Sequence, residues 1–350
     1  VNVTSNTTEH VNFLHFKIPF GKKKYSSQFN QRPRILLSLV TARSKQRPTT
    51  RDDLAVRRAA DAAAAIMTSP ASTSSWFSGL TRASSSSMAG GVSSAPASAS
   101  VPDAPAAAAK AVVAAAGGRR KQLQGTLFKY GPKSAQVAFK TGDFNHQVIF
   151  IGGLTDGLLA TDYLEPLSLA LEVEKWSLVQ PLLSSSYTGY GISSLEQDAL
   201  ELDQLISYLI NKENSEGVIL LGHSTGCQDI VHYMKTNFAC SKAVSGVILQ
   251  APVSDREYRA TLPETAEMID LAAKMISEGR GMDLMPREAN PDAPITAYRF
   301  HSLCSYMGDD DMFSSDLSED QLRQRLGHMS TTQCQQQQQQ QSLFVPSKFG

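Results

Sequence analysis

The sequence predicts an α/β fold in which helices cover both faces of a mostly parallel β-sheet. Two observations support this prediction. Short apolar runs with strand character occur at residues 147–151, 176–180, 217–221 and 246–250, and segments with helical spacing of apolar residues separate the later runs. Strands that alternate with helices form parallel sheets, because each helix returns the chain to the same end of the sheet.

The first of these strands, residues 147–151, has the sequence QVIFI, and residues 152–157 are expected to form the loop that leaves it. The second strand, residues 176–180, ends at Pro181. Proline cannot donate a hydrogen bond to a neighbouring strand, so it marks a boundary.

A helix is expected before the third strand. Ser193 and Glu196 match the capping-box pattern that marks a helix start. The apolar residues that follow recur at steps of three and four on one buried face: Leu195, Ala199, Leu202, Ile206 and Leu209.

The pentapeptide at residues 222–226, GHSTG, lies between the apolar run 217–221 and a segment with helical spacing that continues to Phe238. A G-x-S-x-G sequence between a strand and a helix is the nucleophile elbow of α/β-hydrolases, in which the serine sits on a strained turn. The residues two before and two after the serine must then be small. Ser224 is therefore expected to expose its hydroxyl, with the N–H of Thr225 directed toward a bound carbonyl oxygen.

After the last of these strands the pattern becomes helical. Residues 263–277 are expected to form one helix, and residues 317–326 another that begins near Ser315 or Ser318. An insertion after the sixth strand of an α/β-hydrolase usually forms a cap over the active site. A helical cap is therefore expected at about residues 252–326.

The formal net charge of zero hides two different segments. Residues 1–120 hold 16 Lys and Arg against 5 Asp and Glu, whereas residues 121–350 hold 17 against 28. The acidic folded part argues against nucleic acid as a partner.

No apolar run reaches the ~18 residues that a membrane span needs. The four cysteines show no paired or metal-ligand spacing, which favours free thiols in a reducing compartment, and the cytoplasm is the expected location.

Residues 1–120 are expected to be a disordered or low-complexity leader. Basic patches in residues 1–66 favour disordered or spuriously translated sequence over nucleic-acid contact. Residues 67–118 are dominated by Ser and Ala and contain one acidic residue. They fit either an organellar transit peptide, which would direct the protein to the plastid, or a low-complexity linker.

Four separated motifs resemble those of one protein family: IGGLTDG at 151–157, LGHSTGCQD at 221–229, LQAPVSDR at 249–256 and GDDDMF at 308–313. Together they resemble a plant and fungal branch of the α/β-hydrolase superfamily, which is esterase-like and largely of unknown function. The resemblance covers about residues 121–333. It implies a Ser–acid–His hydrolase with Ser224 as the nucleophile and an oxyanion hole made by the N–H groups of Leu154 and Thr225. It also implies a small-molecule ester or acyl substrate with no cofactor or metal, and it leaves the oligomeric state open.

The other two members of a catalytic triad are not evident. A serine nucleophile needs a histidine base and an acid that orients it, and both follow the serine along the chain. His328 is the candidate base and Asp255 the candidate acid, although Asp255 also fits a hinge of the cap. The run of aspartates at 309–311 lacks metal-ligand spacing and predicts a solvated loop.

About 25 residues follow the cap, fewer than two more strands with a crossover helix would need. The carboxyl-terminal strands are therefore expected to be missing. This makes residues 121–333 an incomplete hydrolase domain and residues 334–350 a Gln-rich, non-homologous tail. Two functions remain: a serine hydrolase of the esterase type, or a catalytically inactive truncated hydrolase that acts at most as a binding protein.

Overall fold

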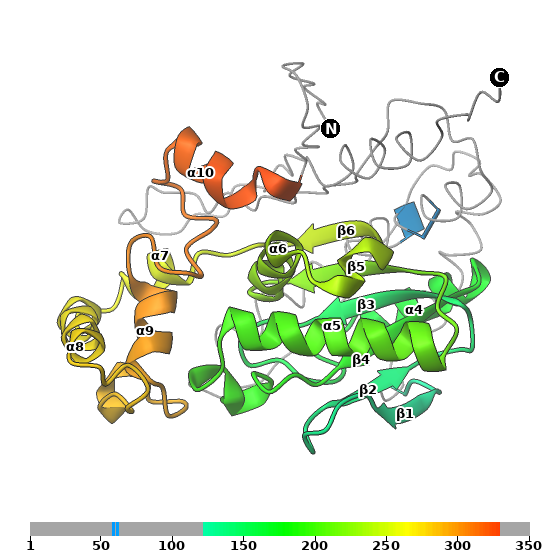
Figure 1. Cartoon of the computed structure of the whole chain (residues 1–350), viewed down its shortest axis with the longest axis horizontal. Helices are drawn as coiled ribbons and strands as arrows, with labels where there is room; N and C mark the ends of the chain where they lie inside the picture. Colours follow the sequence, from blue (N-terminus) through cyan, green and yellow to red (C-terminus); the bar gives the residue numbers. More distant parts are fainter. Residues whose placement is uncertain (1–57, 60, 63–121, 330–350) are drawn as a thin grey trace, which may run out of the picture.

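The computed structural model describes residues 58, 59, 61, 62 and 122–329 of the chain. The expected leader and the glutamine-rich tail lie almost wholly outside these residues. The described part contains one mixed β-sheet, helices on both of its faces, and a group of helices beyond one end of the strands (Figure 1).

Six described strands form the sheet in the order β1-β2-β4-β3-β5-β6. They are β1 (Thr126–Lys129), β2 (Val137–Lys140), β3 (His146–Ile151), β4 (Trp176–Pro181), β5 (Gly217–His223) and β6 (Val244–Gln250). The pairs β1–β2 and β2–β4 are antiparallel, and the remaining neighbours are parallel. This order, with the G-x-S-x-G turn after β5, is that of an α/β-hydrolase fold, so the predicted fold class is confirmed.

The helices and 3₁₀ turns that join and follow these strands are α4 (Leu164–Val173), η1 (Tyr187–Gly191), α5 (Leu195–Lys212), α6 (Gly226–Thr236), η2 (Ala239–Ala243), α7 (Asp255–Arg259), α8 (Thr265–Ser277), η3 (Arg287–Ala289), α9 (Ala297–Cys304) and α10 (Glu319–Leu326). The helices expected at residues 263–277 and 317–326 correspond to α8 and α10. Ser318 is the N-cap of α10 and forms a complete capping box with Gln321.

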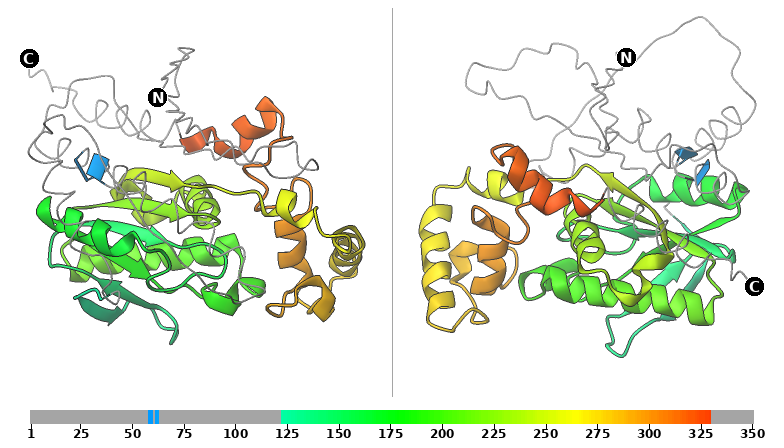
Figure 2. Two further views of the ribbon diagram at one scale, coloured as in Figure 1. Left: turned by 180° about the vertical axis from the view of Figure 1, so that it is seen from behind. Right: turned by 45° about the horizontal axis from the view of Figure 1, so that its top comes forward.

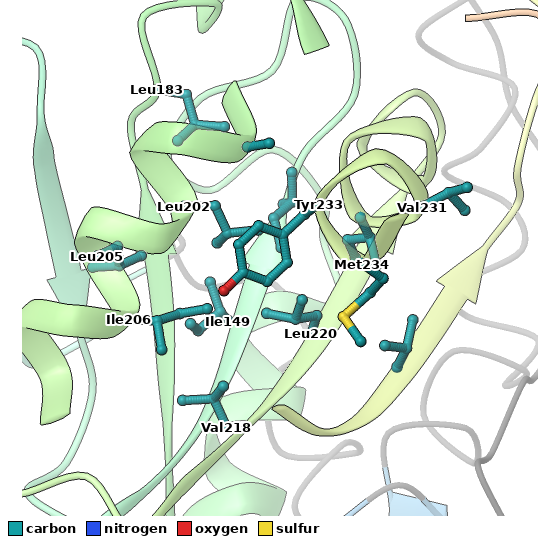
Figure 3. Close-up of a cluster of buried hydrophobic side chains, with 14 of the residues drawn as sticks. Ile149, Leu183, Leu202, Leu205, Ile206, Val218, Leu220, Val231, Tyr233 and Met234 are labelled. Carbon is teal, nitrogen blue, oxygen red and sulfur yellow. The ribbon is translucent and has the colours of Figure 1, made fainter. Parts of the chain in front are cut away.

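Successive side chains along the central strands point to opposite faces of the sheet, so the apolar core packed on the sheet consists of two clusters, one on each face. In β5, Val218 and Leu220 face one cluster, whereas Ile219 and Leu221 face the other. Helices α5 and α6 cover the first face, and α4 covers the second. Figure 3 shows part of the first cluster, where the ring of Tyr233 lies among aliphatic side chains of the sheet and of α5.

The N-cap of α5 is Ser194, one residue after the expected Ser193. Ser194 has extended backbone, and its hydroxyl accepts a hydrogen bond from the N–H of Gln197 at 3.2 Å. The hydroxyl of Ser193 instead donates to the carboxyl of Asp198 at 3.0 Å. The capping box expected from Ser193 is therefore wrong by one residue.

Helices α7, α8 and α9 lie beyond the carboxyl ends of the parallel strands, and the views of Figures 1 and 2 agree on this placement. Buried side chains of α8, α9 and the segment between them form a third apolar cluster that also includes Tyr190 of η1. These helices therefore pack on one another and on η1, at the edge of the sheet where the G-x-S-x-G turn lies.

Candidate active site

The turn after β5 places Ser224 in a strained conformation. Ser224 has a φ of 55°, in the left-handed region that non-glycine residues rarely adopt. Its N–H donates to the carbonyl oxygen of Gln250 at the end of β6, at 3.0 Å. The turn is thus tied to the neighbouring strand, and the next residues begin α6.

Close backbone contacts explain the two glycines of the motif. A Cβ added to Gly222 would lie 2.7 Å from the carbonyl oxygen of Gly226, across the turn. A Cβ added to Gly226 would lie 2.3 Å from the carbonyl oxygen of Ile151 and 2.5 Å from that of Gly152. A side chain at either position would force the backbone apart, as expected for a nucleophile elbow.

The loop after β3 lies directly against the elbow. A Cβ added to Gly153 would lie 3.0 Å from Cβ of Ser224 and 3.4 Å from its hydroxyl oxygen. Within the described residues, the N–H groups of Leu154 and Thr225 have no hydrogen-bond acceptor. Both residues line the same small cavity of about 30 Å³. Two unengaged backbone donors beside a serine hydroxyl are what an oxyanion hole requires.

Asp156 closes the loop that carries Leu154. Its carboxylate accepts the N–H of Gly153 at 2.6 Å and lies 3.4 Å from Nδ1 of His223, the residue before the serine. Burial by itself would raise the pKa of Asp156. The hydrogen bonds from His223 and Gly153 outweigh that effect and hold the pKa below its ordinary value.

Ionisable side chains also form part of the cavity wall. Asp198 and Arg299 are buried, and Asp229 is half-buried. The guanidinium of Arg299 donates to the carboxylate of Asp310 at 2.6 Å and to the carbonyl oxygen of Tyr190 at 3.0 Å. The ion pair, whose side chains are at most 4 % exposed, ties α9 to the segment after it, and the bond to Tyr190 ties α9 to η1.

The carboxyl groups of this wall have raised pKa values. Burial raises the pKa of Asp198 to about 7, against the opposing effect of Arg299. Burial and the charge of Asp198 raise the pKa of Asp229 well above its ordinary value. A protein interior disfavours the ionised form of a carboxyl that lacks its own cation.

The structure does not bring the candidate base to the serine. Nε2 of His328 lies 2.9 Å from the carbonyl oxygen of Val231, on the second turn of α6. Burial lowers the pKa of His328, and the positive charge of Lys235 adds to this effect. His328 therefore faces α6 at Val231, and no hydrogen bond between it and the hydroxyl of Ser224 occurs among the described residues.

Asp255 is the first residue of α7. Its carboxylate lies 3.4 Å from Nε2 of Gln228, and burial together with Asp310 raises its pKa to about 7, against Arg299 and Arg259. No histidine in the described part of the chain forms a hydrogen bond with it. The structure therefore does not join Asp255 and His328 into the acid–base pair of a triad.

The aspartates at 309–311 are not a solvated loop, and that expectation is wrong for two of the three. Asp310 and Asp311 are each 2 % exposed. Asp310 pairs with Arg299, and Asp311 accepts from Nε of Arg256 at 2.9 Å. Residues 310 and 311 thus supply buried carboxylate partners for the arginines of α7 and α9. Over the described residues, no group of three or more His, Cys, Asp or Glu side chains could hold a metal ion.

Asp156 and Asp229 lie within the sequence motifs without a predicted role, and no sequence pattern singles out Asp198 or Arg299. Asp198 could have been noticed, because it lies on α5 one position before the apolar residue Ala199 and is buried with it. Three described cysteines are free thiols. No helix in the described ranges combines the length and apolar character of a membrane span.

The chain is 36% identical over 194 residues to a UPF0613 protein of Schizosaccharomyces pombe, a match that covers 52% of this chain and 61% of the relative. It is 32% identical over 237 residues to the fusarinine C esterase sidJ of Aspergillus fumigatus, which covers 52% of this chain and 65% of that protein. The chain thus spans less than two thirds of the length of either relative.

A similar solved structure is the siderophore hydrolase EstB from Aspergillus fumigatus. It is 31% identical, with a TM-score of 0.49, and the match covers 60% of this chain and 74% of that one. These relatives are fungal, so the comparisons support the fungal side of the expected resemblance and do not single out plants.

Residues 116–348 match a family described as "Protein of unknown function (DUF1749)". The match runs through the glutamines at 335–341, so it lends no support to the expected truncation. Because it includes two thirds of the sequence, the chain belongs to the DUF1749 family.

Proposed function

We propose that this protein is a serine hydrolase of the esterase type, with Ser224 as its nucleophile. One observation carries the proposal: a serine held at a φ of 55° between β5 and α6 lies beside two unengaged N–H groups, those of Leu154 and Thr225. The named esterases among the relatives support the same class of reaction.

In the proposed reaction, Oγ of Ser224 attacks the ester carbonyl carbon, and its proton passes to a base. The carbonyl oxygen becomes an oxyanion, which accepts hydrogen bonds from the N–H groups of Leu154 and Thr225. Loss of a single oxyanion donor in a serine hydrolase costs about 10²- to 10³-fold in kcat. The ester oxygen leaves with a proton as the alcohol, and water then hydrolyses the acyl-enzyme by the same steps in reverse.

The proposal leaves the base unassigned, because the five described histidines form no hydrogen bond with the hydroxyl of Ser224. These histidines are His146, His223, His232, His301 and His328. The substrate is assigned only as a class, an ester of a small molecule. A relative named for fusarinine C makes siderophore esters the first substrates to examine.

A fluorophosphonate probe tests the proposal, because it phosphonylates an activated serine without requiring knowledge of the substrate. The full-length protein is expected to be labelled, and Ser224→Ala is expected to abolish labelling. Ser277→Ala, an exposed serine at the end of α8, is the matched control and should leave labelling unchanged. Labelling that survives in the Ser224→Ala variant would refute the assignment of the nucleophile.

The second candidate function is an inactive hydrolase-like protein. It is favoured by the placement of His328 against Val231 and by the separation of Asp255 from any described histidine. If this function is correct, the folded full-length protein will not react with the probe, and it will not hydrolyse 4-nitrophenyl acetate faster than Ser224→Ala.

A further inference from the structure

Asp156 and His223 link the two parts of the proposed oxyanion hole. Leu154 lies on the loop after β3, and Thr225 lies on the turn after β5. Asp156 belongs to the first segment and His223 to the second, 67 residues later. Their side chains meet at 3.4 Å between Oδ2 and Nδ1. The following inference rests on the proposed function, because it concerns the same pair of N–H donors.

Asp156 fixes the shape of its own loop. Its carboxylate accepts the N–H of Gly153, while its backbone N–H donates to the carbonyl oxygen of Gly153 at 3.0 Å. The carbonyl oxygen of Asp156 also accepts the N–H of Tyr187 in η1 at 3.2 Å. The turn is therefore closed from both ends, and Leu154 lies inside it.

The hydrogen bond from the Gly153 N–H to the Asp156 carboxylate decides which backbone N–H of the loop remains free. The N–H of Gly153 is occupied by the carboxylate, so it cannot serve a substrate, whereas the N–H of Leu154 remains open toward the cavity. Loss of the Asp156 carboxylate would release Gly153 and remove the constraint that directs Leu154.

The ring of His223 also lies near two aromatic side chains of the core. Its ring lies 6.3 Å from the ring of Phe150 and 6.5 Å from that of Tyr163, measured between centroids. Phe150 and Tyr163 belong to the buried cluster under α4. The imidazole therefore lies against the core. Through it, Asp156 is connected to the sheet as well as to its own loop.

We propose that Asp156 and His223 are a positioning pair that sets the separation of the Leu154 and Thr225 N–H groups. A direct role for Asp156 as the base of Ser224 does not fit, because its hydrogen bonds hold its pKa below the ordinary value and no described hydrogen bond joins it to the Ser224 hydroxyl. Its contribution is geometric: it holds one donor at a fixed place relative to the other.

A double-mutant cycle on the full-length chain tests the pair, using Asp156→Ala, His223→Ala and the combination. The control cycle uses Glu196→Ala and His232→Ala, because these residues form a second His–carboxylate contact at 3.0 Å on the exposed side of α5 and α6. Two readouts are measured: the rate of fluorophosphonate labelling together with kcat and KM for 4-nitrophenyl acetate, and hydrogen exchange of peptides that cover residues 150–158 and 222–228.

Each site variant is expected to lower the labelling rate and kcat by about 10- to 100-fold, with little change in KM. The double variant should fall no further than the worse single variant, since the pair acts as a unit. Exchange should rise about tenfold in both peptides from either substitution, because each residue restrains the other's segment. The control cycle should change none of these quantities by more than about twofold.

Hydrogen exchange distinguishes a failure of this inference from a failure of the proposed function. If the wild-type protein is not labelled, the proposed function fails, yet coupled exchange in the two segments would still support the positioning pair. The inference is overturned if each substitution affects only its own segment, or if the losses in the double variant add as those of independent sites do.

Discussion

Substitution of Gly226 by alanine tests the contact on which the site depends. Gly226 is the first residue of α6, and an added Cβ would lie 2.3 Å from the carbonyl oxygen of Ile151 and 2.5 Å from that of Gly152. Both oxygens belong to the backbone that leads into the loop of Leu154. Neither can rotate away as a side chain would, so the elbow and the loop must separate.

The size of the separation follows from the distances. Ordinary van der Waals contacts of a Cβ begin near 3.4 Å, so the backbone at Gly226 must move by about 1 Å relative to Ile151. A misplacement of about 1 Å in a catalytic constellation costs about 10²-fold in rate. Overpacking of this kind also costs about 1–3 kcal/mol of unfolding free energy.

The assay is the second-order rate of fluorophosphonate labelling, measured with urea unfolding of the same samples. Gly281→Ala is the matched control, because its added Cβ would meet nothing closer than 3.5 Å. Labelling of Gly226→Ala at the wild-type rate, in a protein that remains folded, would refute the argument that Gly226 sets the approach of the oxyanion loop.

Three further predictions concern buried polar groups. The pKa of Asp198 is raised to about 7, so its folded form holds a proton that the unfolded chain has lost, and the free energy of unfolding falls as pH rises from about 4 to about 7. In the Asp198→Asn variant, the urea midpoint should depend less on pH between pH 5 and pH 8. An unchanged pH dependence of the midpoint would contradict this. Arg299→Met should cost about 3–5 kcal/mol in urea unfolding, because it leaves Asp310 buried without its cation; a loss below 1 kcal/mol would show that the pair is dispensable. Tyr233→Phe keeps the packed ring but removes its 2.9 Å hydrogen bond to Asp203, so a loss of about 1–2 kcal/mol is expected by thermal unfolding, and wild-type stability would argue against that bond.

The central strands and the longer helices could be predicted because their signals are local. The run at 147–151 lies within β3, and the run at 217–221 lies within β5, where alternate residues face two separate apolar clusters. β1 could not be predicted in the same way. It has four residues, of which three are exposed, so it lacks an apolar run and is stabilised by pairing with β2.

Helix α4 is not evident in the sequence, for a different reason. Its sequence, LEPLSLALEV, has apolar residues on most sides: Leu164 and Leu167 are buried, whereas Leu169 and Val173 are exposed. A helix without a clear polar face gives no strong 3.6-residue period. Its direction is decided by packing on the sheet, which the local sequence does not encode.

The elbow could be predicted because its constraints involve neighbours along the chain, and two glycines must flank Ser224 at fixed spacing. The contacts around it involve distant residues. His223 meets Asp156 across 67 positions, and Arg299 reaches the carbonyl oxygen of Tyr190 across 109. No spacing rule connects residues so far apart, so these partners emerge only once the strands are placed.

The two sides of the cavity are stabilised by different interactions, so they are expected to respond differently to a change in pH. The sheet side rests on β5 and on apolar side chains of both faces, whose burial depends little on pH. The helical side rests on Arg299, whose partners Asp310 and the carbonyl oxygen of Tyr190 anchor α9 beside the elbow. Asp198, Asp229 and Asp255 near this guanidinium have raised pKa values because desolvation disfavours their ionised forms, so a rise in pH ionises them and lowers stability on that side. Alkaline conditions should therefore loosen α9 before the sheet, which amide hydrogen exchange of peptides from α9 and β5 can measure at pH 6 and pH 9 after correction for the intrinsic rate.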